Sequence, residues 1–284
     1  MSSVKAYAKI NLGLRILGRR EDGFHDIETV FHRVNIFDEI AISRAPEISL
    51  DSNRPDLPSG DANLCTRAAR MLQARYDVNE GAHLQLTKRI PVGAGLGGGS
   101  SDAAATLLAL NKTWKLDRDV SELEPLALEL GSDVAYFLRQ GSAHATGRGE
   151  NLEYFDLDLP YWIVLVYPNI HISTAWAYEH TQISNPKSRI PLKQILLRGL
   201  EDANRLKPLL PNDFEPLILR THPAIARLKK SLFDLGAEFA QLSGSGSSVY
   251  GLFSSGESAD NATEQLRNDH EVFITAPHFK PGET

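Results

Sequence analysis

The sequence has very little cysteine and no long apolar or basic run. Its 284 residues include one cysteine, Cys65, which excludes an internal disulfide and suits a reducing cytosol. The longest apolar run, residues 161–167, is far too short to span a bilayer, and the N-terminus lacks the apolar centre of a signal peptide. A net charge of −6 argues against nucleic-acid binding. We therefore expect a cytoplasmic protein with neither nucleic acid nor membrane as a partner.

Three familiar nucleotide-binding signatures are also missing or incomplete. The glycine-rich segment at residues 93–99 has no lysine before Ser100, so it is not a Walker A loop. The H-R-D and D-F-G motifs of protein kinases are absent. The segment contains G-x-G-x-x-G, but Pro91 interrupts the strand that would lead into it in a dinucleotide fold, and no acidic residue closes a second strand roughly 20 residues later.

What the sequence does contain is a dense glycine loop between a strand pattern and a helix pattern. Five of the seven residues at 93–99 are glycine, residues 84–90 alternate, and residues 101–110 are rich in alanine and leucine. This layout directs free N–H groups and the positive end of a helix dipole at an anion. A flexible linker or a helix-packing loop is the alternative, but linkers are rarely followed at once by such a helix. The segment is therefore interpreted as a phosphate cradle.

The periodicity along the chain predicts a mixture of strands and helices in two parts. An acidic, proline-containing stretch at residues 156–160 is the candidate boundary, giving an N-terminal domain at 1–158 and a C-terminal domain at 159–284. The second part has the strand and helix order of an α+β, ferredoxin-like unit. The predicted strands are 4–16, 26–34, 39–43, 162–167, two pieces within 239–253, and 271–275; the predicted helices are 63–76, 101–110, 121–131 with a capping box at 121–124, one from 173, 192–206, 223–235 and 258–267.

Several polar residues have ordinary interpretations when spacing alone is considered. Lys9 is typical of a solvated strand lysine, and His25 of an exposed loop histidine. Asp133 and Asp102 each follow a predicted helix start, where a carboxylate favours the helix dipole. Cys65 falls on a helix and is expected in the core. None of these residues acquires a functional role from composition or periodicity.

Separated stretches of the chain together resemble one family. Pro91-Val-Gly-Ala-Gly-Leu-Gly-Gly-Gly-Ser-Ser101 resembles the ATP-binding motif of the GHMP small-molecule kinases, and Ser243-Gly-Ser-Gly246 resembles their C-terminal glycine motif. Ala8-Lys-Ile-Asn-Leu-Gly-Leu14, Asp22-Gly-Phe-His25 and Leu130-Gly-Ser-Asp-Val134 are narrower and resemble the 4-diphosphocytidyl-2-C-methyl-D-erythritol kinases. The resemblance covers essentially the whole chain.

The resemblance implies a fold and a reaction. The fold would be that of GHMP kinases, with an N-terminal ATP-binding domain and a ferredoxin-like C-terminal domain. The reaction would be ATP-dependent phosphorylation of the 2-hydroxyl of 4-diphosphocytidyl-2-C-methyl-D-erythritol, giving the 2-phosphate and ADP in the non-mevalonate isoprenoid pathway. ATP and Mg²⁺ are the implied cofactors, because the β- and γ-phosphates need charge neutralisation. No protein carboxylate ligand for the metal follows from the sequence.

The resemblance also implies roles for individual residues. Asp133 would accept the proton of the substrate hydroxyl, and Lys9 would orient that hydroxyl and stabilise developing charge. The ATP site would comprise Asn63, Leu64 and Lys88 near adenine and Pro91, Gly93, Gly95, Leu96, Gly97, Gly98, Gly99, Ser100 and Ser101 around the phosphates.

At the substrate's other end, the resemblance implies a cytosine site. His25 would contact the cytosine edge, and Phe24 and Tyr178 would flank the ring; many relatives have tyrosine where this chain has Phe24. Asn11 and Thr174 would contact the polyol or the diphosphate. The remaining implied substrate residues are Phe31, Ser243 and Gly244.

Two alternative functions stay open at this point. One is another GHMP kinase, acting on homoserine, mevalonate or a sugar, although none of these substrates has a base to stack on an aromatic ring. The other is a nucleotide-binding protein without catalysis, which retention of both Lys9 and Asp133 disfavours. The sequence leaves the oligomeric state open.

Overall fold

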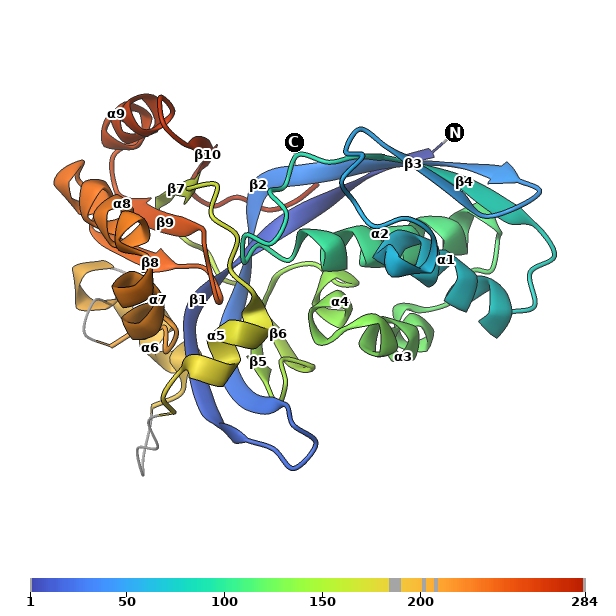
Figure 1. The fold of residues 1–284 in the computed structure, drawn as a ribbon, viewed down its shortest axis with the longest axis horizontal. Coiled ribbons are helices and arrows are strands. Elements are labelled where there is room, and N and C mark those ends of the chain that lie inside the picture. Colours follow the sequence, from blue (N-terminus) through green and yellow to red (C-terminus); the bar gives the residue numbers. More distant parts are fainter. Residues whose placement is uncertain (1, 184–189, 201–202, 207–208, 283–284) are drawn as a thin grey trace. The chain divides into compact units, whose positions relative to one another are not determined.

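The chain forms two compact units in a computed structural model that describes residues 2–183, 190–200, 203–206 and 209–282 (Figure 1). The first unit comprises Met1–Ala8, Ile36–Val92 and Gly97–Gln140, and the second comprises Lys9–Asn35, Gly93–Leu96 and Gly141–Thr284. Two long strands, β1 (Ser2–Arg19) and β2 (His25–Ala45), contribute residues to both units. The glycine loop is likewise divided between them, after Leu96.

The first unit packs helices on a small sheet. The second half of β2 pairs antiparallel with β4 (Gly81–Thr87), which pairs parallel with β3 (Ser49–Ser52). The central helix α2 packs against three other helices, and its run of Ala103, Ala104 and Ala105 allows this close approach because the side chains are small. The helices of this unit are η1 (Gly60–Ala62), α1 (Leu64–Arg75), α2 (Gly98–Thr113), α3 (Val120–Leu130) and α4 (Ser132–Phe137).

The second unit contains a four-stranded antiparallel sheet in the order β10-β7-β9-β8. Helices α8 and α9 pack on this sheet, and Val164, Leu232 and Ala259 belong to one core. The strands are β7 (Trp162–Tyr167), β8 (Phe239–Leu242), β9 (Val249–Phe253) and β10 (Glu271–Thr275). The helices are α5 (Thr174–His180), α6 (Leu192–Gly199), η2 (Ala203–Leu206), α7 (Glu215–Thr221), α8 (Pro223–Asp234) and α9 (Gly256–Leu266).

A second group of strands completes this unit. Strand β5 (Ser142–Thr146) pairs with β6 (Asn151–Phe155) and, at Thr29–Phe31, with the first half of β2. The N-terminal strand β1 also pairs with β2. These pairings fix the positions of the side chains that β1 and β2 contribute to the candidate site below.

The α+β fold predicted from the sequence is confirmed, with local corrections. The strands predicted at 26–34 and 39–43 are one continuous strand, β2. The capping box predicted at 121–124 is wrong: α3 begins at Val120, and the backbone N–H of Asp119 donates to Oε2 of Glu122 over 3.0 Å. The helix predicted at 192–206 ends at Gly199, and residues 201–202 within that prediction lie outside the described residues. The predicted division into domains at 1–158 and 159–284 differs in kind from the two compact units, which each contain several separate segments. That division stays a prediction.

No helix within the described ranges is both long enough and apolar enough to cross a membrane. Cys65 is buried in α1, as the sequence predicts.

Candidate active site

Lys9 is the centre of a polar cluster in the second unit. Its side chain is buried on β1, with the residue only 5% exposed, so the interpretation as a solvated strand lysine is wrong. The ammonium donates to Oδ1 of Asn11 over 2.7 Å and to the carbonyl of Gly95 over 3.5 Å. It also lies 5.0 Å from the ring centre of Phe31. A lysine buried with these partners has a fixed position, which a surface lysine lacks.

The amide of Asn11 is oriented by β2. Its Nδ2 donates to Oγ1 of Thr29 over 2.9 Å, and that hydroxyl donates to the carbonyl of Gly13 over 2.6 Å. Because the hydroxyl proton is used on Gly13, Thr29 accepts from the amide nitrogen, and Oδ1 of Asn11 is left to face Lys9. This chain of hydrogen bonds holds both polar side chains of β1 in one arrangement.

Two glycine segments far apart in sequence meet beside this cluster. Oγ of Ser243 donates to the carbonyl of Gly95 over 3.0 Å, and the carbonyl of Leu96 accepts from the backbone N–H of Lys9 over 3.0 Å. Gly95 has φ of +79°, and a Cβ there would lie 2.2 Å from the carbonyl oxygen of Ser243. A Cβ on Gly244 would lie 3.2 Å from Oδ1 of Asn11. Gly95 is therefore required by close backbone approach, and Gly244, with φ of +57°, leaves little room for a Cβ beside Asn11.

The predicted aromatic residues also belong to the second unit, and the structure brings two of them together. His25 stacks on Tyr178 with ring centres 4.8 Å apart, and Tyr178 meets Phe214 edge-on. Burial, with a smaller contribution from Arg19, lowers the pKa of His25, so its ring is neutral at pH 7 and carries one donor and one acceptor. Phe24 is exposed, with the guanidinium of Arg148 4.8 Å from its ring centre.

Helix α5 positions Tyr178 together with Thr174. The helix begins at Thr174 after Ser173, whose hydroxyl accepts from the N–H of Trp176. The hydroxyls of Thr174 and Ser245 are 3.0 Å apart. Tyr178 follows Thr174 by one helical turn, so both side chains lie on one face of α5.

The first unit holds the start of the helix that follows the glycine loop. Gly97 has φ of +67° and precedes α2, whose first residues are Gly98, Gly99 and Ser100. Their backbone N–H groups lack helical acceptors, which makes this helix start suited to an anion. The hydroxyl of Ser101 donates to the carbonyl of Tyr7 over 2.8 Å. Pro91 is buried before the loop, and Gly93 belongs to the second unit with φ of +68°.

Asp133 also belongs to the first unit. It lies half-buried in the first turn of α4, a helix that packs against α2. Gly131 ends α3 and precedes α4, so the short Gly-Ser segment turns the chain and sets the place of Asp133. Lys9 and Asp133 belong to different units.

The residues predicted near adenine have structural roles in the first unit. Asn63 is the N-cap of α1: its Oδ1 accepts from the N–H of Cys65 over 2.9 Å, and its Nδ2 donates to the carbonyl of Pro58 over 3.1 Å. Leu64 is the first residue of α1 and lies 3.5 Å from where a Cβ of Gly99 would be. Lys88 is buried and bound to two carboxylates. That Asn63, Leu64 and Lys88 contact a nucleotide stays a prediction.

Sequence reasoning did not single out Asp38 or Thr29. Asp38 is fully buried and accepts from Lys88 and from the backbone N–H groups of Arg89 and Ile90, the segment that leads into the glycine loop. A usable signal exists, because Asp38 alternates with Ile36 and Ile40 and so falls on the apolar face of β2. Spacing predicted that Asp102 would favour the helix dipole from the first turn of α2, and this is wrong. Asp102 lies beyond the first turn, and its side chain binds Lys88.

Comparison with known families places both parts of the chain in one group. The family described as "GHMP kinases N terminal domain" matches residues 63–141, and "GHMP kinases C terminal" matches residues 193–271. The chain is 46% identical over 279 residues to a "4-diphosphocytidyl-2-C-methyl-D-erythritol kinase" of Chlorobium phaeobacteroides (strain BS1), with 98% of each chain covered. It is 43% identical to a protein of the same name from Chlorobaculum tepidum, again with 98% of each covered.

Solved structures agree with these matches. A crystal structure of 4-(cytidine 5'-diphospho)-2C-methyl-D-erythritol kinase has a TM-score of 0.81 and 33% identity, covering 96% of this chain and 98% of that one. Homoserine kinase from Cytophaga hutchinsonii has a TM-score of 0.72 at 20% identity, covering 98% of this chain and 95% of that one, which shows a shared fold alone.

Proposed function

The chain belongs to the 4-diphosphocytidyl-2-C-methyl-D-erythritol kinases of the GHMP kinase family, and from that premise we propose how its residues carry out the reaction. It is an ATP-dependent kinase of isoprenoid precursor synthesis. The group transferred is the γ-phosphoryl of ATP, and the acceptor is the 2-hydroxyl of 4-diphosphocytidyl-2-C-methyl-D-erythritol. The observation that carries the proposal is the buried Lys9 cluster, which is bound to the glycine loop at Gly95.

Lys9 and Asp133 act on the hydroxyl that receives the phosphoryl group. Phosphoryl transfer needs positioning and charge stabilisation more than covalent help. The ammonium of Lys9, fixed by Asn11 and Gly95, orients the hydroxyl and stabilises negative charge on the transferred group. Asp133 takes the hydroxyl proton as the new P–O bond forms. The products are the 2-phosphate and ADP.

The phosphates of ATP bind at the glycine loop and the start of α2. The N–H groups of Gly98, Gly99 and Ser100 donate to phosphate oxygens, and the helix dipole adds a favourable potential. Only glycine at position 95 leaves room for Ser243, whose hydroxyl donates to the carbonyl of Gly95. ATP is expected to bind mainly through backbone groups.

Mg²⁺ is expected to accompany the nucleotide, because the β- and γ-phosphates need charge neutralisation. Among the described residues, no group of three or more histidine, cysteine, aspartate or glutamate side chains could hold a metal ion. The first turn of α2 contains no acidic residue, and the nearby Asp102 binds Lys88. When bound, Mg²⁺ would supply charge neutralisation at the phosphates.

The cytidyl end of the substrate binds at His25 and Tyr178. A neutral imidazole can pair with both a donor and an acceptor on the cytosine edge. Stacking on an aromatic face is worth about 1–3 kcal/mol per base, so Tyr178 adds affinity without choosing the base. Phe24, exposed and close in sequence, supplies a second aromatic face. The hydrogen bonds of His25 would then distinguish cytosine from other bases.

Replacing His25 with alanine is expected to weaken the cytidyl substrate selectively. The variant loses the edge hydrogen bonds and the stack on Tyr178, so KM for that substrate should rise about tenfold or more, while KM for ATP stays within about twofold. Steady-state kinetics with each substrate varied in turn measures both values.

A matched control is His180→Ala. His180 also stacks on an aromatic ring, that of Trp176 at 4.9 Å, and lies in the same unit. This variant should leave both KM values unchanged. A selective rise of KM for ATP in His25→Ala would contradict the placement of cytosine at His25.

A further inference from the structure

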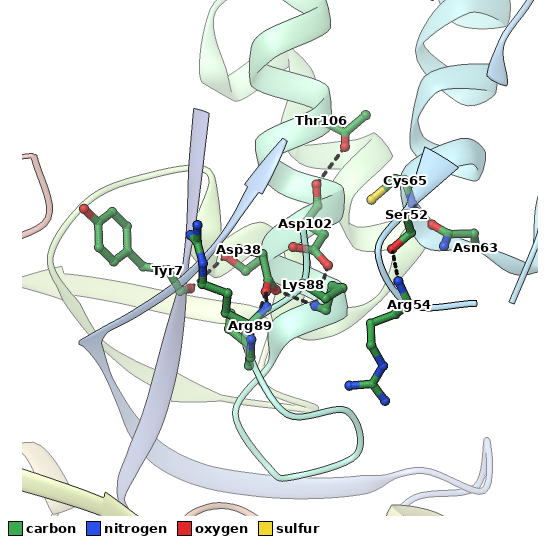
Figure 2. Close-up of polar contacts among 12 residues, drawn as sticks. Tyr7, Asp38, Ser52, Arg54, Asn63, Cys65, Lys88, Arg89, Asp102 and Thr106 are labelled. Atoms are coloured by element: carbon green, nitrogen blue, oxygen red, sulfur yellow. Dashed lines mark hydrogen bonds and ion pairs between the residues drawn. The ribbon is translucent and has the colours of Figure 1, made fainter. Parts of the chain in front are cut away.

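A buried cluster of two aspartates and one lysine lies beneath the start of α2 in the first unit (Figure 2). Lys88 follows β4, Asp38 comes from β2 and Asp102 from α2. The ammonium of Lys88 donates to Oδ2 of Asp38 and, over 2.7 Å, to Oδ2 of Asp102. All three side chains are at most 4% exposed.

The hydrogen bonds of the cluster leave one oxygen unexplained. Oδ1 of Asp38 accepts from the N–H groups of Arg89, at 2.5 Å, and Ile90, at 2.9 Å, so both of its oxygens are used. Oδ1 of Asp102 is buried and has no hydrogen-bond partner among the described residues. A buried carboxylate oxygen without a donor is costly, whereas a protonated oxygen could donate to a neighbouring acceptor.

The charges of the cluster do not balance if every group is ionised. Two carboxylates and one ammonium would bury one net negative charge, which the interior of a protein disfavours. Burial raises the pKa of Asp102 to about 8; the charge of Asp38 raises it further, and Lys88 opposes the shift. Two carboxylates that share one site commonly hold one proton between them.

We propose that Asp102 acts as a neutral carboxylic acid, with its proton on Oδ1 directed toward Asp38, so that the cluster carries no net charge beneath the phosphate-binding helix start. Lys88 then binds both side chains, and the proton makes Oδ1 of Asp102 a donor toward Asp38, whose side chain interacts with this carboxyl. The proton sits on Asp102 rather than Asp38 because Asp38 already accepts three hydrogen bonds.

The neutral state matters because the cluster touches the phosphate cradle. A Cβ on Gly98, the first residue of α2, would lie 3.2 Å from Nζ of Lys88. A net negative charge here would oppose both the helix dipole and the bound triphosphate. Asp102 is thus a positioning residue, which ties α2 to β2 and β4 without placing a charge under the phosphates. This consequence rests on the proposed function, whereas the proton itself does not.

Two charged groups act on the carboxyl of Asp102, namely Asp38 from β2 and Lys88 from the segment after β4. From α1, the buried thiol of Cys65 faces the cluster, and burial together with Asp102 raises its pKa, so it keeps its proton. Any change in cluster charge between pH 7 and pH 9 therefore belongs to Asp102.

Carboxyl ¹³C NMR of the full chain labelled at aspartate Cγ tests the proton directly. The wild-type spectrum should contain one Cγ signal that is absent from the spectrum of Asp102→Asn. Its chemical shift should be that of a protonated carboxyl at pH 6.5 and should titrate with a midpoint near pH 8. An Asp102 signal already at its ionised position at pH 6.5 would overturn the proposal. This measurement does not depend on activity, so it separates failure of the proton from failure of the kinase assignment.

The effect on ATP is tested with the conservative variant Asp102→Asn, which has an N–H donor where the proton would be. Wild-type KM for ATP should rise by about threefold or more from pH 7 to pH 9 as Asp102 ionises. In Asp102→Asn, KM at pH 7 should stay within about twofold of wild type, and the alkaline rise should vanish. Asp117→Asn, an exposed aspartate of the same unit, should keep the wild-type profile. An alkaline rise retained in Asp102→Asn would overturn the role of Asp102.

Discussion

Asp133→Asn is expected to lose nearly all turnover while it still binds ATP. Asparagine has the same shape as aspartate but cannot accept a proton, so kcat should fall by about 10²–10⁴-fold. The phosphates are expected to bind through backbone N–H groups at the start of α2, which this change does not alter, so ATP affinity should stay within about twofold. Turnover measured by ADP release and affinity measured by calorimetry separate the two quantities.

A control for charge accompanies this variant. Glu129→Gln removes one negative charge from an exposed position near the end of α3, in the same unit, and should leave kcat unchanged. Wild-type kcat in Asp133→Asn would contradict the assignment of Asp133 as the base. Parallel losses of kcat and ATP affinity would point to a general effect on the nucleotide site.

The second large effect is on stability, at Asp38. Its fully buried carboxylate accepts from Lys88, Arg89 N–H and Ile90 N–H. Asp38→Ala leaves the N–H groups of Arg89 and Ile90 buried without their acceptor and removes one of the two carboxylates that bind Lys88, which should lower the free energy of unfolding by about 3–5 kcal/mol. Urea denaturation followed by circular dichroism measures the change.

Asp51→Ala is the matched control for this prediction. Asp51 lies on β3 of the same unit with its side chain 80% exposed, and its Oδ2 is 3.7 Å from Nε2 of His83. This variant should change the free energy of unfolding by less than about 0.5 kcal/mol. Equal losses in the free energy of unfolding for the two variants would contradict the prediction, because they would show that the buried hydrogen bonds of Asp38 add no stability.

Asp102 adds a pH dependence to stability with a definite sign. Its pKa is raised in the folded protein to about 8, from 3.8, so the folded state holds a proton that the unfolded state has lost at neutral pH. The favourable contribution is complete below the unfolded pKa and is lost as pH rises toward 8. Asp102→Asn lacks this titration. Its free energy of unfolding, relative to wild type, should therefore improve between pH 5 and pH 8.

Local sequence patterns predict much of the fold for clear physical reasons. The alternation of apolar residues in β1 and the cap at Asn63 before α1 depend on neighbouring residues alone, and both appear in the structure. The capping box of α3 lies two residues before the predicted one, because Asp119 and Ser121 are both favoured N-cap residues and the local pattern does not distinguish them. Local patterns also miss that β2 runs without interruption through 26–43.

The candidate site depends on contacts between distant segments, which spacing cannot reveal. Lys9 is interpreted as a solvated lysine until Gly95, 86 residues later, is found beside its ammonium. Gly95 and Ser243 are 148 residues apart and share a hydrogen bond. The resemblance names these residues, but the reason each is needed comes from tertiary contacts. The same holds for Asp38. Its position on the apolar face of β2 can be predicted, but its partners Lys88, Arg89 and Ile90 follow β4 and cannot be predicted from spacing.

The most direct test of the kinase assignment is ADP release with Mg·ATP and a panel of acceptors: 4-diphosphocytidyl-2-C-methyl-D-erythritol, mevalonate, homoserine and galactose. Saturable turnover with the cytidyl substrate alone is the result we predict, with loss of that turnover in Asp133→Asn as its internal control. Preferred turnover of another acceptor would contradict the cytosine site at His25 and Tyr178. Saturable ATP binding without turnover of the cytidyl substrate would contradict the roles assigned to Lys9 and Asp133.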